Sequence, residues 1–357
     1  MKRIDQRLLG MHLGKPLVGP DTIHIDVTNG CNTNCVTCWD HSPHLTEARP
    51  QNWKRQKIDL ATVTDILNET SELGGLRSVI LSGMGEPFTH PEIYSMIAEV
   101  KRRGLNLTII TNLVACDPAK ILELNVDQLL IGLHAASEST YCAFHPSFSQ
   151  TEWQRVLHNL RYFRDANRRF KHIHVICKEN AHEIVAMIRQ AADYPAELVN
   201  FKLASLRNGT EAVRITEEQR KQILLHELPL AQKEAEHLNV KVNFPVFIEQ
   251  LRAQQEATAP IEEIGCFMGY SYGRILVDGT VLFCCSPEIV VGRLADAPFY
   301  ELWDGPNWTQ IRAQLRRGEY FPACHQCGKF NMNHTLSQRF KQVFGEQRLY
   351  QVTGRRI

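Results

Sequence analysis

The feature that most constrains the fold of this chain is an alternation of apolar and amphipathic segments along its first 240 residues. Short β-branched runs, such as "TIHIDVT" at 22–28 and "LRSVILSG" at 76–83, are each followed by a segment with helical spacing. Near-continuous apolar strands that alternate with helices are typical of a parallel sheet covered by helices. The sequence therefore predicts six strand–helix repeats, in a sheet that is either open or curled into a full or partial barrel.

The expected elements follow one another without a long structureless gap. The strands span 22–28, 76–83, 105–112, 126–135, 171–178 and 196–205, and residues 239–244 are a candidate for one more strand. The helices span 59–73, 91–103, 117–124, 137–144, 150–166, 181–193 and 216–238. In such sheets the carboxyl ends of the strands face the ligand, so we expect functional residues there.

The pattern changes after about residue 245. "YGRILVDGTVLFCC" at 272–285 predicts a β-hairpin with its turn at Asp278-Gly279. We therefore expect an N-terminal extension at 1–21, a core domain at 22–244 and a small C-terminal domain, a hairpin plus helix, at 245–357.

Composition limits the classes of protein that this chain can represent. The formal net charge of the 357 residues is +1, which argues against a general nucleic-acid or membrane-surface binder. The chain has no apolar run long enough for a signal peptide or a transmembrane helix, so we expect a cytoplasmic protein without a membrane anchor. The 11 cysteines are then expected to be reduced thiols that serve as metal ligands or catalytic groups.

Three of these cysteines stand close together in "NGCNTNCVTCWD" at 29–40, in the spacing C-x3-C-x2-C. The segment is polar and offers no core for thiols to fill, so Cys31, Cys35 and Cys38 are candidate metal ligands. A structural zinc site needs a fourth ligand, which His41 or His44 would supply. An iron–sulfur cluster held by three cysteines would instead keep one iron open for a substrate or cofactor.

Further polar residues fall at the predicted carboxyl ends of strands. "SGMGEP" at 82–87 follows the second strand, and its glycines allow the backbone to approach a ligand closely. Asn112 follows Thr111 at the end of the third strand, and His134 ends the fourth. Lys178, Asn180 and Lys202 are candidates by position alone.

The three-cysteine loop, the glycine motif and the strand order together resemble the radical S-adenosylmethionine (SAM) superfamily. The resemblance covers about residues 22–240 and implies a partial (β/α)6 TIM-like barrel. It implies that Cys31, Cys35 and Cys38 hold a [4Fe–4S] cluster whose fourth iron binds SAM. The cluster would cleave SAM to a 5′-deoxyadenosyl radical that abstracts hydrogen from a substrate. By match, the SAM-contacting residues are Gly83, Gly85, Glu86, Asn112 and His134. The chain departs from the family where an aromatic residue usually precedes the third cysteine, because Thr37 stands there and Trp39 follows the cysteine.

A second group of cysteines lies in the C-terminal part, at Cys266, Cys284, Cys285 and the C-x2-C pair Cys324 and Cys327. Two such pairs can form a zinc ribbon. The spacing also resembles the SPASM domain of radical SAM enzymes, in its shorter "twitch" form, because Asn333 stands where a further cysteine is expected. This resemblance implies one auxiliary [4Fe–4S] cluster held by Cys266, Cys284, Cys324 and Cys327.

Cys285 is left over, and three roles remain open for it: an alternative ligand, an ordinary strand residue, or a hydrogen-atom donor. Cys142 is a second candidate donor, and His134 is a candidate catalytic base, as are Lys178, Lys202 and Arg274.

Three functional hypotheses follow. The first is a radical SAM oxidoreductase that acts on a sugar, cyclitol or similar small metabolite. The second is a maturase that cross-links or epimerises a peptide, although only about twenty residues precede the first strand, which leaves little room for a peptide-recognition domain. The third is a non-catalytic zinc-binding scaffold. The two enzymatic hypotheses imply a reductant partner such as flavodoxin or ferredoxin.

Overall fold

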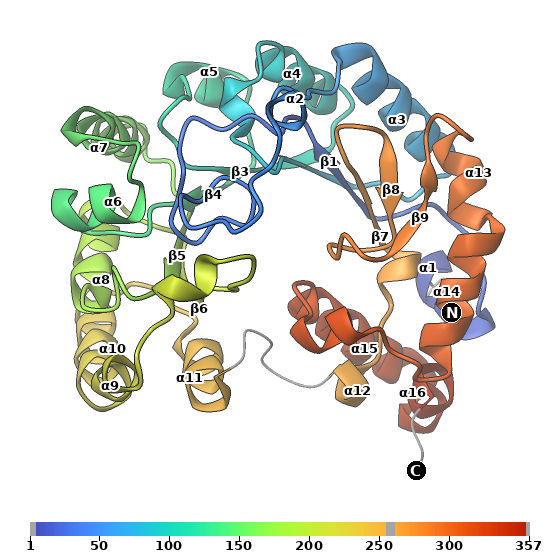
Figure 1. Cartoon of the computed structure of the whole chain (residues 1–357). Helices are drawn as coiled ribbons and strands as arrows, with labels where there is room; N and C mark the ends of the chain where they lie inside the picture. Colours follow the sequence, from blue (N-terminus) through green and yellow to red (C-terminus); the bar gives the residue numbers. More distant parts are fainter. Residues whose placement is uncertain (1–4, 255–260, 355–357) are drawn as a thin grey trace.

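The computed structural model describes residues 5–254 and 261–354. The six predicted strands lie side by side in sequence order, and each pairs in parallel with the next one along the chain. The strands are β1 (Thr22–Asp26), β2 (Ser78–Ser82), β3 (Asn106–Thr111), β4 (Gln128–Gly132), β5 (Lys171–Ile176) and β6 (Leu198–Leu203). The sheet curls, and its helices lie on the outside, which confirms the predicted partial barrel (Figure 1).

Each predicted helix of the barrel is present. They are α3 (Leu60–Glu72), α4 (Ile93–Arg102), α5 (Pro118–Glu123), α6 (Glu138–Phe144), α7 (Gln150–Asp165), α8 (Ile184–Asp193), α9 (Glu217–Gln222) and α10 (Leu228–His237). The sequence did not predict α1 (Gln6–Leu13), or the short α2 (Gln51–Lys54) in the long connection after β1. The expected helix at 216–238 is interrupted by a π-helical turn at Ile223–Glu227. Pro229 has no backbone N–H and cannot continue the ordinary hydrogen-bond ladder, which accounts for the wider turn before it.

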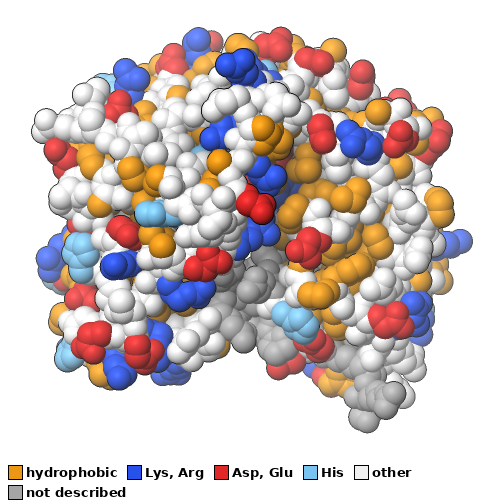
Figure 2. Space-filling view, viewed as in Figure 1, with side chains coloured by type: hydrophobic (Ala, Val, Ile, Leu, Met, Phe, Trp, Pro, Cys, Tyr) orange, Lys and Arg blue, Asp and Glu red, His pale blue; other side chains and the backbone are white. Residues whose placement is uncertain are grey.

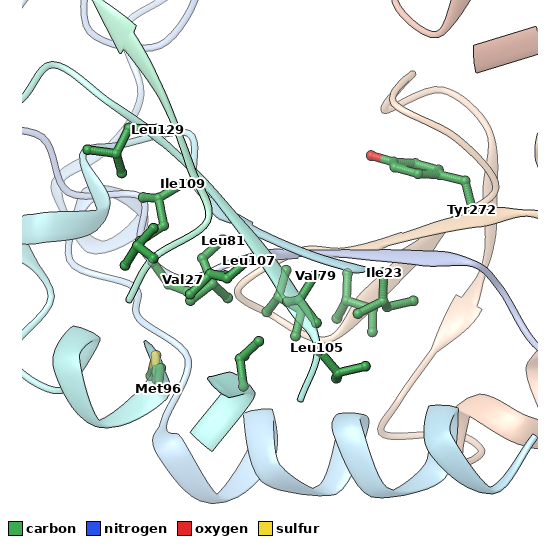
Figure 3. Close-up of a cluster of buried hydrophobic side chains, with 14 of the residues drawn as sticks. Ile23, Val27, Val79, Leu81, Met96, Leu105, Leu107, Ile109, Leu129 and Tyr272 are labelled. Carbon is green, nitrogen blue, oxygen red and sulfur yellow. The ribbon is translucent and has the colours of Figure 1, made fainter. Parts of the chain in front are cut away.

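The two faces of the strands differ in chemistry. Ile23, Val79 and Leu107 are wholly buried against the helices, and Figure 3 shows them on that side of the strands. The alternate residues face the interior of the barrel. That interior is open between β3 and β6, since Ile110 is 41% exposed and Lys202 is exposed.

The predicted hairpin is present, with Gly279 at a positive φ in its turn, but it does not stand alone. Its first strand, β7 (Tyr272–Ile275), pairs in parallel with β1, followed by the antiparallel strands β8 (Thr280–Leu282) and β9 (Val290–Arg293). The result is one nine-stranded sheet in the order β6-β5-β4-β3-β2-β1-β7-β8-β9. Its hydrogen bonding crosses the boundary expected near residue 245, and the division into domains stays a prediction.

Residues 239–244 do not form the additional strand that the sequence suggested. Only an isolated bridge joins Val242 to Val199, and α11 (Phe244–Ala253) begins directly afterwards. The side-chain amide of Asn243 accepts a hydrogen bond from the Phe201 N–H and donates one to the Phe201 carbonyl, both at 2.8 Å. At the edge of β6, the Asn243 side chain thus forms hydrogen bonds to the backbone that a seventh strand would otherwise have formed.

The remaining helices pack around the hairpin. They are α12 (Ile261–Ile264), α13 (Phe299–Asp304), α14 (Pro306–Arg316), α15 (Phe330–Phe344) and α16 (Glu346–Thr353). Trp303 and Trp308 lie on α13 and α14 and contact one another edge to face in the core. Among the described residues, no helix is both long enough and apolar enough to cross a membrane.

Candidate active site

The first three cysteines lie in the loop that follows β1, and Figure 1 shows this loop across the carboxyl ends of the strands. Cys31, Cys35 and Cys38 are free and partly buried. Burial raises the pKa of each thiol, and the pKa of Cys31 is raised to about 12. The neighbouring thiols raise the pKa of Cys31 and Cys35 further, so the three groups lie close enough to repel one another as thiolates.

His41 and His44 are the histidines that would complete a zinc site with this loop, but one is hydrogen-bonded to the backbone and the other is exposed. The His41 ring is hydrogen-bonded at 2.9 Å to the carbonyl of Asn29, and His44 is exposed.

The glycine motif packs directly on the cysteine loop. The Gly85 N–H donates to the carbonyl of Thr28 at 3.1 Å, and the Glu86 N–H donates to that of Gly30 at 2.9 Å. A Cβ atom at Gly85 would lie 1.8 Å from the Gly30 oxygen, and one at Gly83 would lie 2.1 Å from the Thr28 oxygen. Neither glycine has a positive φ within the described chain. The need for glycine is therefore steric: only a bare backbone fits against this loop.

Glu86 joins the ends of β2 and β3. Its carboxylate accepts hydrogen bonds from the Thr111 hydroxyl and the Asn112 N–H, both at 2.7 Å, and from the Phe88 N–H at 3.1 Å. Burial raises its pKa to about 7, although these three bonds act in the opposite direction. Because its oxygens are occupied, Glu86 is placed to position the third strand end.

Asn112 in turn reaches the cysteine loop, since its Nδ2 donates to Asn32 Oδ1 at 2.8 Å. Both residues of this pair belong to segments that the sequence singled out. The end of β3 is therefore tied to the loop that carries the first cysteine group.

His134 has a left-handed backbone with φ of 60°, and its ring stacks on Phe144. Its Nδ1 accepts the Val175 N–H at 3.1 Å, and burial lowers its pKa well below the usual range. A neutral imidazole that accepts at Nδ1 carries its proton on Nε2. That nitrogen lies 2.8 Å from where a Cβ of Gly132, on the interior face of β4, would stand. His134 is therefore a hydrogen-bond donor toward the interior, and this geometry does not suit a general base.

Two further positional candidates differ in what they can do. Asn180 is wholly buried, and its Nδ2 donates to the carbonyls of His134 and Val175, both at 2.8 Å. It therefore ties the ends of β4 and β5 together. Lys178 is exposed.

The second cysteine group is assembled from three segments. Cys266 precedes β7, Cys284 and Cys285 follow β8, and Cys324 and Cys327 precede α15. Burial raises the pKa of Cys266, and Cys327 and Cys324 raise it further. A hydrogen bond to Cys285 raises the pKa of Cys284, and the same bond, with Lys329 and Arg274, lowers the pKa of Cys285. Each thiol of this group has at least one other thiol of the group among the causes of its pKa shift, so the three segments bring the thiols near one another.

Cys142 lies elsewhere, on α6. Burial, Glu138 and Glu152 raise its pKa, and none of these influences comes from a thiol of either cysteine group. This placement gives no support to a role for Cys142 as hydrogen-atom donor. Cys116 and Cys177 are buried, as ordinary small apolar residues are.

A polar network, which the sequence did not reveal, lies between the two cysteine groups. Arg274 on β7 donates to both carboxylate oxygens of Asp26 at the end of β1, at 3.1 and 2.8 Å. The His24 ring bonds the Tyr272 hydroxyl at 2.7 Å and the Ser82 hydroxyl at 2.5 Å. These side chains occupy alternate positions of neighbouring strands. The alternation of polar residues within "TIHID" and "YGRI" is therefore the pattern that could have indicated this network in the sequence.

The face drawn in Figure 2 is hollowed along its middle. Lysine and arginine side chains lie in the hollow, and hydrophobic side chains gather along one of its walls. The cysteine loop contacts the segment that follows β6, since the Trp39 Nε1 donates to the Ser205 carbonyl and the Arg207 guanidinium lies 3.7 Å from the centre of the Trp39 ring. The hollow on this face therefore offers a ligand both basic side chains and an apolar wall.

Comparison with known protein families agrees with this architecture. Residues 25–191 match the Radical SAM superfamily, and residues 266–328 match the SPASM iron–sulfur cluster-binding domain. The chain belongs to the radical SAM superfamily and carries a SPASM-type domain. Its cofactors are therefore SAM, the [4Fe–4S] cluster that binds it, and an auxiliary iron–sulfur cluster.

Two relatives illustrate the range of similarity. The chain is 24% identical over 315 residues to the AdoMet-dependent heme synthase of Methanosarcina barkeri, covering 84% of this chain and 86% of that one. It is 31% identical over 92 residues to the tungsten-containing aldehyde ferredoxin oxidoreductase cofactor-modifying protein of Pyrococcus furiosus, covering 25% of this chain and 23% of that one.

Solved structures share the fold. SuiB of Streptococcus suis bound to S-adenosylmethionine superposes with a TM-score of 0.63 at 16% identity, over 88% of this chain and 72% of that one. The enzyme anSMEcpe with bound AdoMet superposes with a TM-score of 0.62 at 14% identity, over 95% of this chain and 96% of that one.

The donor sets suit the cofactors. Three thiols lie in a polar loop, and five thiols from three segments lie near one another at the second centre. In the described part of the chain, no three Cys, His, Asp or Glu side chains are already drawn together as they would be around a single metal ion. Thiolates are the ligands that iron–sulfur clusters take.

Proposed function

We propose that the protein is a radical SAM oxidoreductase that oxidises a sugar, cyclitol or similar small polar metabolite by two electrons. When bound, SAM and the two clusters supply the hydrogen-atom abstraction and the one-electron acceptance that such an oxidation needs. The observation that carries the proposal is the second thiol group, which is joined through Arg274 and Asp26 to the end of β1. An electron-accepting cluster beside the interior of the barrel suits the oxidation of a substrate that is bound in that interior.

We assign the cluster ligands as the sequence suggested. Cys31, Cys35 and Cys38 hold the SAM-binding cluster, and Cys266, Cys284, Cys324 and Cys327 hold the auxiliary cluster. Cys285 is the member of the second group that this assignment leaves over, and the Arg274 guanidinium donates to its carbonyl at 3.3 Å. Gly83 and Gly85 bring the backbone to the first cluster, while Glu86, Asn112 and His134 shape the SAM pocket.

Oxidation of an alcohol also requires a hydroxyl proton to leave. His134 accepts the Val175 N–H at Nδ1 and presents a donor to the interior, and the Arg274 guanidinium does not exchange its proton, so neither suits this role. Lys202 lies on the interior face of β6, because its neighbour Phe201 is wholly buried on the helix side. We assign Lys202 to favour the deprotonated hydroxyl in this interior.

The test also includes two other classes of substrate, peptides and haem precursors. SuiB has been solved with its precursor peptide SuiA, and anSMEcpe with the Cp18Cys peptide, but at 15% and 13% identity these likenesses show the fold alone. The heme synthase is similar over most of both chains, so haem precursors are tested as well. A flavodoxin or ferredoxin is the proposed electron donor.

The deciding experiment is anaerobic incubation of the reconstituted protein with SAM and a reductant. We expect 5′-deoxyadenosine formation to rise with a polyol or cyclitol, together with a ketone product. A rise only with peptides or only with haem precursors would overturn the proposed substrate class. We also expect about eight irons per chain, falling to about four in the Cys31/Cys35/Cys38 triple alanine variant. A colourless protein with bound zinc would overturn the assignment of both centres.

A further inference from the structure

Asn333 is wholly buried on α15, beside the second cysteine group. Its Nδ2 lies 4.0 Å from the Sγ of Cys266 and 3.7 Å from the Sγ of Cys327. One side-chain amide therefore touches two thiols that come from separate segments of the chain, one before β7 and one before α15.

The orientation of this amide is fixed by a third contact. The backbone N–H of Phe267 donates to Asn333 Oδ1 at 2.8 Å. A flipped amide would place its NH2 group against that N–H, donor against donor, so the oxygen must face Phe267 and the NH2 group must face the sulfurs. Asn333 is thus held as a donor toward Cys266 and Cys327.

Hydrogen bonds to ligand sulfurs are among the factors that set the potential of an iron–sulfur cluster. A donor of this kind stabilises the reduced, more negative state more than the oxidised state, and it acts strongly where water is excluded. We propose that Asn333 sets the potential of the auxiliary cluster, raising it through N–H···S hydrogen bonds to Cys266 and Cys327. The proposal rests on the assignment of these cysteines as ligands of that cluster.

A merely structural role for Asn333 is the competing explanation, because its Oδ1 also holds the Phe267 backbone. Substitution by aspartate separates the two roles. Asn333→Asp keeps an oxygen for the Phe267 N–H, but replaces the donor that faces the sulfurs with a charged acceptor. Asn333→Leu removes the donor without adding a charge. Asn331→Asp is the matched control, because Asn331 is exposed in the first turn of the same helix.

The experiment uses the full chain with Cys31, Cys35 and Cys38 changed to alanine, so that only the second centre carries iron. The midpoint potential is measured by redox titration followed by electron paramagnetic resonance. We expect Asn333→Asp to disfavour reduction by about tenfold or more, about 59 mV for a one-electron couple. Asn333→Leu shifts the potential in the same direction by less, and Asn331→Asp leaves it near the parent value.

The outcomes separate the two assignments. An unchanged potential in both Asn333 variants, or an equal shift in Asn331→Asp, overturns the role of Asn333 while the cluster assignment stands. A parent variant that retains no iron overturns both. If Asn333→Asp does not load iron, the Asn333→Leu comparison decides, since leucine introduces no charge beside the sulfurs.

Discussion

Arg274 and Asp26 form a two-point ion pair in which Nε and Nη2 of the guanidinium meet the two carboxylate oxygens. The pair is almost entirely withdrawn from solvent and joins β7 to the end of β1, directly before the first cysteine loop. The same guanidinium donates to the carbonyl of Cys285 and touches the Met84 sulfur at 3.9 Å. One side chain therefore sets the spacing between both cysteine groups and the glycine motif.

Removing one partner of this pair should destabilise the protein strongly. In Asp26→Ala the Arg274 charge stays buried without compensation, and we expect a loss of about 3–5 kcal/mol in the free energy of unfolding. The double variant Asp26→Ala/Arg274→Met removes both charges and should recover much of that loss. Urea denaturation of the single and double variants measures the coupling. As a control, Asp165→Ala breaks the exposed pair with Arg164 and should cost less than about 1 kcal/mol. Equal effects of the two aspartate substitutions would contradict this interpretation.

The glycine motif should tolerate no side chain where it meets the cysteine loop. Gly85→Ala places a Cβ against the Gly30 carbonyl, so the turn must move, at a cost of about 1–3 kcal/mol. We expect this variant to lose iron from the first centre and most SAM cleavage. Gly104→Ala is the control, because its Cβ meets nothing within 4 Å and only its left-handed backbone, with φ of 69°, is strained. Iron analysis and 5′-deoxyadenosine formation compare the two variants, and full activity in Gly85→Ala would refute the steric argument.

Stability should fall as the pH is lowered from 7.5 to 5.5. Burial lowers the pKa of His172 to about 4 and that of His174 to about 3, from 6.5. Below pH 6.5 the unfolded chain therefore binds protons that the folded chain does not, so the free energy of unfolding decreases with falling pH. Each histidine contributes up to about 1.4 kcal/mol per pH unit in this window.

The variant His174→Phe tests this origin, because His174 already stacks on Phe201 and its ring nitrogens have no hydrogen-bond partner in the described structure. We expect its denaturation midpoint to depend less steeply on pH than that of the wild type. His158→Gln alters an exposed histidine and should leave the slope unchanged. An unaltered slope in His174→Phe would assign the acid sensitivity to other groups.

Lys202→Met should reduce substrate-dependent 5′-deoxyadenosine formation by about tenfold or more at neutral pH, if Lys202 favours loss of the hydroxyl proton. The loss should also alter the pH–rate profile. Lys171→Met is the control, because Lys171 lies on the same face of the neighbouring strand β5 but at its other end. The residue of β5 that pairs with Lys202 is Val175. A similar loss in both variants would indicate a general electrostatic effect.

The strands and helices of the barrel were predictable because each carries a local pattern. In "SVILS", Val79 and Leu81 are buried on one side and Ser78 and Ile80 are less so, as the period of a strand requires. The contact between the glycine motif and the first cysteine loop also followed from topology, since the carboxyl ends of adjacent parallel strands meet.

The polar network was not predictable in the same way. Asp26 and Arg274 are 248 residues apart, as are His24 and Tyr272, and no local pattern pairs them. In the sequence, Asn333 was notable only because it stands where a cysteine was expected. Its role as a hydrogen-bond donor to the sulfurs depends on the Phe267 N–H, which orients its amide. Such roles become visible only when the fold brings distant segments of the chain together.

The pairing of β1 with β7 has a consequence for how the protein is made. As the ribosome releases the chain, β1 has one edge that remains without its partner until β7, which begins at Tyr272, has also emerged. An exposed edge is a template for pairing with other chains, and contacts between distant segments form slowly. A nascent or truncated product that ends before Tyr272 would therefore be vulnerable to aggregation, and the sheet is complete on this side only after β7 has been made.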